Sequence, residues 1–127
     1  MKKLCAVAAI VECVTGLALM VSPSFVTKLL LGGDVLGVGI VLGRLAGLGL
    51  FGLGLAWWSA RDTIVGKTPM VRAILAYNLF VALYLLVIGI DGESVGIMLW
   101  PAFAFHGLLA LILARAWLVL SAPPRVL

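Results

Sequence analysis

VLGVGIVLGRLAGLGLFGLGLAWWSA, residues Val35–Ala60, is the stretch that decides the fold. It is longer than the ~20 apolar residues that cross a bilayer, and its one charge is Arg44. A GxxxGxxxG pattern runs through it, formed by Gly39, Gly43 and Gly47. Small residues at this spacing let two helix backbones approach closely in lipid. We therefore predict a membrane-spanning helix against which the other helices pack, with Gly54 outside the packing face.

The composition places the whole chain in a membrane. Of its 127 residues, 65% are hydrophobic and 11% are charged, and the mean hydropathy is +1.29. A soluble domain is about a quarter charged, so this chain has too few charges to cover a globule with polar surface. The net charge of +4 does not indicate nucleic-acid binding, because the basic residues are spread over the predicted helix ends and form no single patch.

Hydropathy predicts an all-α fold, a four-helix transmembrane bundle that forms one domain over residues 1–127. The spans are predicted at residues 4–21, 35–60, 71–90 and 101–120. The segment Ser24–Gly33 is too short to span, and we predict that it forms a short interfacial helix. Pro101 is expected in the first turn of the fourth span. The alternative is a longer helix that begins at Val95 and kinks at Pro101.

The first apolar segment has two interpretations. Lysines followed by an apolar run are typical of a signal peptide as well as of a membrane span. Glu12 interrupts the apolar run, and no convincing small-residue cleavage site follows it. We therefore expect residues 4–21 to be retained as the first span.

The distribution of charge predicts the orientation of the bundle. An even number of spans leaves both termini on one side, which carries Lys2, Lys3, Arg61, Lys67, Arg72 and Arg125. The opposite side carries Lys28 together with Asp34, Asp91 and Glu93. Because cytoplasmic loops are enriched in Lys and Arg, we expect a protein of the cell (inner) membrane with both termini in the cytoplasm.

Glu12 and Arg44 are the charged residues deepest in the predicted spans. Glu12 lies nine residues before Val21, and Arg44 lies nine residues after Val35, so both are predicted about 13–14 Å below the outer face. We expect them to pair. In one interpretation the pair is structural and fixes helix register. In the other, Glu12 binds a proton or a substrate and Arg44 gates it.

Polar groups in the third and fourth spans suggest further contacts. His106 and Tyr84 are predicted at similar depth and could hydrogen-bond. His106 is then a core histidine, a proton relay or an axial haem ligand, and a bis-histidine haem would require a dimer. Asn78 is expected to bond across helices, while Arg115 extends its charged end to the interface.

The two cysteines indicate neither a disulfide nor a metal site. Cys5 and Cys13 are eight residues apart on one predicted helix, about 12 Å, which is too far for a disulfide. We expect both to act as small apolar packing residues. No metal-ligand spacing is present, and the glycine pairs of GLGLFGLGLA lie inside an apolar span with no preceding strand, which excludes a dinucleotide-binding loop.

The chain resembles the small bacterial four-helix membrane proteins of the DoxX-like and uncharacterised type. The resemblance rests on GLALMVSP after the first span, GRLAGLGLFGLGLAWW in the second, and His106-Gly107-Leu108-Leu109 in the fourth. It implies the four-helix fold but no site residues, because such families mostly lack assigned chemistry. Small multidrug transporters are similar in having four helices and a first-span glutamate, but Arg44 departs from what an open cation site requires.

These observations lead to two main functional hypotheses. The first is a non-enzymatic accessory or interaction module, with the lipid bilayer and a homo-oligomer or larger membrane complex as partners and with no cofactor, metal or nucleic acid. The alternative is a small proton-coupled transporter of hydrophobic or cationic compounds that uses Glu12. A third hypothesis is a redox accessory that holds haem or quinone near His106. No catalytic residue is assigned.

Overall fold

The computed structural model describes residues 2–62 and 69–121, which form an all-α fold. The helices are α1 (Lys2–Val21), α2 (Pro23–Leu31), α3 (Val38–Ala60), α4 (Pro69–Asp91) and α5 (Leu99–Ser121). All except α2 are long and apolar enough to cross a membrane, giving four candidate spans. The predicted all-helical fold with four helices that could cross a membrane is therefore confirmed, and the helix boundaries lie within three residues of the predicted spans.

Prolines and one glycine set the helix boundaries that the sequence left open. Pro23 is the first residue of α2, where its missing N–H costs no helical hydrogen bond. Gly32 ends α2 with a φ of 75°, a left-handed conformation that glycine adopts without strain. Because α5 begins at Leu99, Pro101 lies in its first turn, and the alternative of a kinked helix from Val95 is wrong.

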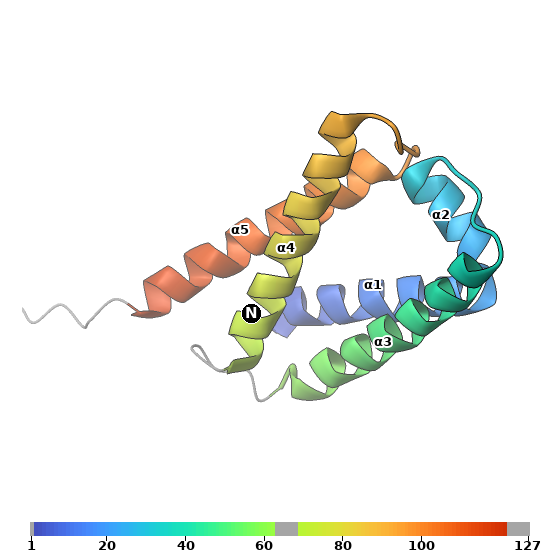
Figure 1. Cartoon of the computed structure of the whole chain (residues 1–127). Helices are drawn as coiled ribbons and strands as arrows, with labels where there is room; N and C mark the ends of the chain where they lie inside the picture. The colour runs from blue at the N-terminus through green and yellow to red at the C-terminus, as the bar shows by residue number, and fades with distance from the viewer. Residues whose placement is uncertain (1, 63–68, 122–127) are drawn as a thin grey trace, which may run out of the picture.

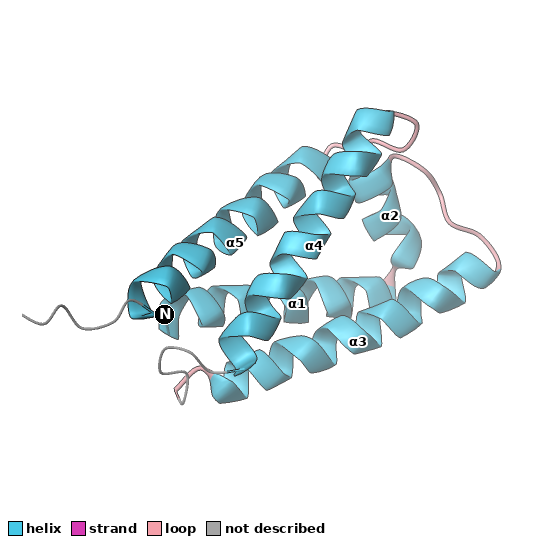
Figure 2. Ribbon diagram, turned by 60° about the vertical axis from the view of Figure 1, so that its left-hand side comes forward, coloured by secondary structure: helices cyan, strands magenta, loops and turns pink. Residues whose placement is uncertain are grey.

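The spanning helices form two antiparallel pairs, α1 with α3 and α4 with α5 (Figures 1 and 2). Close contact between α1 and α3 depends on small residues. A Cβ atom added to Gly47 would lie 2.6 Å from the carbonyl oxygen of Gly16. One added to Gly54 would lie 2.7 Å from the carbonyl oxygen of Ala9. The backbones therefore approach to distances that only glycine permits at these positions.

The glycine face of α3 differs from the predicted one at both ends. Gly54 packs as tightly as Gly47, because seven residues are almost two full helical turns and place both on one face. The expectation that Gly54 lies outside the face is wrong. A Cβ on Gly43 would meet the ring of Pro23, whereas one on Gly39 would meet only the side chain of Val35, which directly precedes α3.

The hydrophobic core lies where the two helix pairs converge, at the end of the bundle that contains Lys2. Its buried residues come from the start of α1, the end of α3, the start of α4 and the second half of α5: Cys5, Ala8, Ala9, Trp57, Val71, Ile74, Leu109 and Leu113. Polar contacts tie the same end together. Lys2 lies 3.6 Å from Asp62, and the guanidinium of Arg72 lies 5.8 Å from the Trp117 ring centre. The first and last described residues thus share one end of the bundle.

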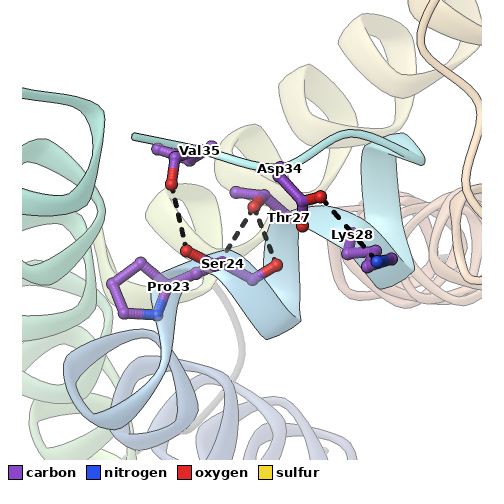
Figure 3. A network of polar contacts seen from close by, with 6 residues as sticks. All are labelled: Pro23, Ser24, Thr27, Lys28, Asp34 and Val35. Atoms are coloured by element: carbon purple, nitrogen blue, oxygen red, sulfur yellow. Dashed lines mark hydrogen bonds and ion pairs between the residues drawn. The ribbon is translucent and has the colours of Figure 1, made fainter. Parts of the chain in front are cut away.

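The helix α2 closes the opposite end, where the two pairs diverge (Figure 1). It is anchored on both sides. The Ser24 hydroxyl donates to the carbonyl oxygen of Val35 over 3.0 Å, and Lys28 lies 3.8 Å from Asp34 (Figure 3). On the other side, the N–H of Gly96 donates to the carbonyl oxygen of Leu30 over 3.0 Å. The short helix therefore links the corner of the α1–α3 pair to the start of α5.

Candidate functional site: a cavity between the helix pairs

An apolar cavity of about 560 Å³ lies between the two helix pairs, beneath α2. Helices α1, α2, α4 and α5 supply most of its wall, and α3 contributes Leu50. The wall is predominantly aliphatic and aromatic, and the polar side chains on it are those of Glu12, Thr15, Thr27, Tyr77 and His106. The cavity exists because the pairs converge on the core at one end and are held apart by α2 at the other.

Glu12 is the acidic residue of the cavity. It lies near the middle of α1, ten residues from Lys2, and its exposed fraction is 2%. The residues around it on the buried side of α1 are small: Cys5, Ala8, Ala9 and Gly16. These small residues let α3 pack closely against α1 while the longer Glu12 side chain reaches the cavity wall.

Tyr77 on α4 is the hydrogen-bond partner of Glu12. Its hydroxyl donates to Oε2 of Glu12 over 2.9 Å, across the gap between the two helix pairs. Two aromatic neighbours lie against the phenol ring. The Trp57 ring lies 5.3 Å away and the His106 ring 6.1 Å away, centre to centre, and both contacts are edge-to-face.

Sequence reasoning missed Tyr77, although a signal for it exists. Tyr77 and Tyr84 are both tyrosines inside one apolar span, seven residues apart, and only the assumed depth of the helices favoured Tyr84.

Asn78 and His106 form the second polar contact between spans. His106 Nδ1 lies 2.8 Å from Asn78 Oδ1, and Asn78 Nδ2 donates to the carbonyl oxygen of Ile74 over 2.8 Å. A carbonyl oxygen only accepts, so the amide nitrogen of Asn78 faces Ile74 and its oxygen faces the histidine. Nδ1 of His106 therefore carries a hydrogen, which leaves Nε2 as the acceptor of the neutral ring. The expected bond of Asn78 across helices is formed.

The predicted contact between Tyr84 and His106 is not formed. Tyr84 is 68% exposed and does not line the cavity. The reason is the helical face rather than the depth. Ala82 faces Gly107 of α5, and Tyr84, two residues further on, is rotated by about 200° from it. His106 pairs with Asn78 instead.

The predicted pair of Glu12 and Arg44 is not formed either. Arg44 is exposed on α3, and the residues of α3 level with Glu12 are near Phe51, whose carbonyl oxygen lies 3.9 Å from Cys13 Sγ. Arg44 is seven residues, about 10 Å, closer to the end of the bundle that carries α2. Counting residues from Val21 and Val35 treats α1 and α3 as ending in one plane, whereas Pro23 packs beside Gly43 and α3 extends beyond it.

The remaining candidates lie apart from the cavity. Arg115 is exposed on α5, near the end of the bundle that contains Lys2. Cys5 is a free thiol in the core, and Cys13 is a half-buried free thiol at the α1–α3 contact. Among residues 2–62 and 69–121, no cluster of three or more His, Cys, Asp or Glu side chains could hold a metal ion.

The chain matches no protein-family model, no curated protein and no solved structure. The resemblance to DoxX-like proteins therefore stays a prediction.

Proposed function

We propose that the protein is a non-enzymatic membrane protein that binds a small hydrophobic molecule in the cavity between its helix pairs. The cavity itself carries this proposal. Its volume of about 560 Å³ is within the range of ~300–1,000 Å³ that is typical of small-molecule sites. A mostly apolar wall with a few polar groups that fix orientation is also typical of such sites.

The exposed residues of the cavity wall favour a ligand that enters the cavity from the membrane. Three of the lining residues are exposed, Val14 at 62%, Phe25 at 61% and Met98 at 44%, and Val14 also lines a second, shallow pocket between α1 and α3. Val14 lies two residues from Glu12 and hence near the middle of a spanning helix. An opening at that depth faces hydrocarbon, so a hydrophobic compound reaches the cavity by moving sideways through the bilayer.

Proton-coupled transport is the second candidate, and the position of Glu12 favours it. A carboxyl group at mid-depth that lines a cavity is the kind of intramembrane group that proton relays and carriers use. In this case a substrate should release a proton from the detergent-solubilised protein, and Glu12→Gln should abolish that release. A release that persists in Glu12→Gln would contradict a role of this carboxyl in transport.

The bundle is proposed to lie in the cell (inner) membrane with both termini in the cytoplasm. The end that contains Lys2 also carries the basic side chains of Lys3, Arg61, Arg72 and Arg115. The opposite end carries Lys28 with Asp34, Asp91 and Glu93. This asymmetry supports the proposed orientation, because Lys and Arg are enriched on the cytoplasmic side. Membership of the DoxX-like type and assembly into a homo-oligomer or larger complex belong to the same proposal.

Filling the cavity tests the binding function. Ala102 lines the cavity, whereas Ala104 on the same helix is exposed, so the two provide a matched pair of substitutions. The fluorescent probe is pyrenemethanol, titrated against the protein in phosphatidylcholine nanodiscs with empty nanodiscs as the blank. Ala102→Phe should abolish binding beyond the blank, and Ala104→Phe should bind like the wild type. Equal binding by the two variants would overturn the proposal.

A further inference from the structure

The charge of Glu12 has no counter-charge in the part of the bundle that the structure describes. The described residues that line the cavity include no lysine or arginine. Among residues 2–62 and 69–121, most basic side chains, including Lys28, lie near the ends of helices. The exception is Arg44, which is exposed on α3. The ion pairs in this part of the chain involve Asp34 and Asp62 but not Glu12. Glu12 is thus a 2%-exposed acid inside an apolar bundle without a cationic partner.

The hydrogen bonding of Glu12 is also incomplete. Its carboxyl accepts one hydrogen bond, from Tyr77 to Oε2. A carboxylate offers about four acceptor positions, so most of them, including all those of Oε1, have no donor among the described residues. Buried polar groups are normally hydrogen-bonded, and an acceptor left without a donor in an apolar interior is costly. A donor from outside the protein would therefore find a vacant acceptor on the cavity wall.

The groups that face Glu12 come from several helices, and none of those described donates a hydrogen bond to its Oε1 atom. Tyr77 on α4 donates to Oε2, and the His106 ring on α5 lies 6.1 Å from the Tyr77 ring, with its Nδ1 bonded to Asn78. Cys13 is adjacent in the chain but directs its sulfur at the carbonyl oxygen of Phe51 on α3. Towards α2 the wall is mostly apolar, with Val26, Leu29 and Leu30, and the Thr27 hydroxyl there donates to carbonyl oxygens of its own helix. A ligand thus meets one acidic side chain, Glu12, on a wall that is otherwise mostly apolar.

Resting on the proposed binding function, we infer that the cavity takes a hydrophobic amine in its ammonium form. The ammonium group donates hydrogen bonds to the free carboxyl oxygen of Glu12 and supplies a counter-charge that the described residues do not provide. The hydrophobic body lies along the apolar side chains of α2 and the first turns of α5. The Tyr77 hydroxyl keeps its bond to Oε2 and so orients the carboxyl group towards the ligand. A proton competes with the ammonium group for the same carboxylate.

Three probes with one aromatic body test this inference: pyrenemethylamine, pyrenemethanol and pyrenecarboxylic acid. Each is titrated against the protein in phosphatidylcholine nanodiscs, with empty nanodiscs to subtract partitioning into lipid. The amine should bind the wild type about tenfold or more tightly than the alcohol, which is the ratio that one charge-assisted hydrogen bond supports. The acid should bind more weakly than the alcohol, because a carboxylate near Glu12 is repelled.

Glu12→Gln removes the negative charge of the site and nearly preserves its shape. It should lower the amine affinity to that of the alcohol and leave the alcohol affinity within about twofold. The matched control is Glu93→Gln, which removes the same charge from an exposed position between α4 and α5 and should leave all three affinities unchanged. Should Glu12→Gln fail to fold, the ratio of amine to alcohol affinity in the wild type decides alone. A ratio near one overturns the inference.

The two proposals fail in different ways. If the alcohol binds in a manner sensitive to Ala102→Phe but the amine binds no better, the cavity is a site for uncharged compounds and only the ammonium inference is wrong. If Glu12→Gln lowers amine and alcohol affinity equally, Glu12 has a structural role and the inference is again wrong. If no probe binds beyond the empty nanodisc, the proposed binding function is wrong as well.

Discussion

Tyr77 on α4 donates a hydrogen bond to Glu12 on α1 across 2.9 Å, and this bond joins the two helix pairs beside the cavity. The pairs otherwise meet mainly through apolar side chains at the converging end of the bundle. One polar contact thus fixes the relative position of α1 and α4 and directs the one buried acid in the described part of the chain at the cavity. Cavity shape and carboxyl orientation depend on the same pair.

Removing the Tyr77 hydroxyl should destabilise the bundle measurably. Tyr77→Phe keeps the ring contacts with Trp57 and His106 but removes the bond to Glu12. A hydrogen bond between spanning helices contributes about 0.5–2 kcal/mol, and this is the loss we expect in the free energy of unfolding. Tyr84→Phe is the matched control and should change stability by less than about 0.5 kcal/mol, because Tyr84 is exposed. Unfolding in mixed detergents measures both, and equal losses would exclude the bond as the cause.

Substitutions at the glycines of α3 should separate the packed face from the open face. Gly47→Leu and Gly54→Leu place a side chain against the backbone of α1 and should each cost about 2 kcal/mol or more. Gly52→Leu should be tolerated, because a Cβ atom there has nothing within 4 Å. Thermal melting in detergent, followed by circular dichroism, compares the three variants. A loss at Gly52 as large as that at Gly54 would place a further contact on the open face.

The orientation of the bundle can be tested with single cysteines. Cys5 and Cys13 are first replaced by alanine, and a cysteine is then placed at Asp62 or at Glu93, which lie at opposite ends of the bundle. A membrane-impermeant maleimide should label Glu93→Cys in intact cells and should label Asp62→Cys only after the membrane is opened. The reverse pattern would show that the basic end faces outward, against the expectation from its lysines and arginines.

The sequence predicts the positions of the helices well but predicts poorly which side of each helix packs against its neighbours. The membrane environment explains why the second prediction is harder. Long apolar runs bounded by Pro23, Gly32 and Pro101 set the elements, so the spans could be placed within a few residues. In a soluble protein the polar side of each helix would also identify its buried side, but a helix in lipid is apolar all round. Gly54 and Tyr84 show the consequence. Gly54 was expected outside the packed face, and matching depth paired Tyr84 with His106 although Tyr84 lies on another face of α4.

Depth along the membrane normal was a second source of error. Counting residues from Val21 and from Val35 places Glu12 and Arg44 at the same depth only if the two spans end in one plane. The corner formed by α2 shifts α3 along α1, so that Phe51 lies near the level of Glu12. A rule that counts residues cannot include such a shift, which depends on how Pro23 packs against Gly43. Glu12, Asn78 and His106 could still be named as polar residues inside spans, since that requires no register.

Double-mutant cycles on unfolding free energy should distinguish the two partners that have been considered for Glu12. Glu12→Met removes the acceptor at similar volume and is combined with Tyr77→Phe in one cycle and with Arg44→Met in the other. Residues in direct contact couple by about 0.5–3 kcal/mol, whereas distant residues add within about 0.5 kcal/mol. The cycle with Tyr77 should therefore show coupling, because the two side chains are 2.9 Å apart. The cycle with Arg44 should be additive, because Arg44 is exposed on α3 about 10 Å from the level of Glu12. Coupling to Arg44 and additivity with Tyr77 would restore the ion pair, give Glu12 a counter-charge within the bundle, and remove the basis for an ammonium ligand in the cavity.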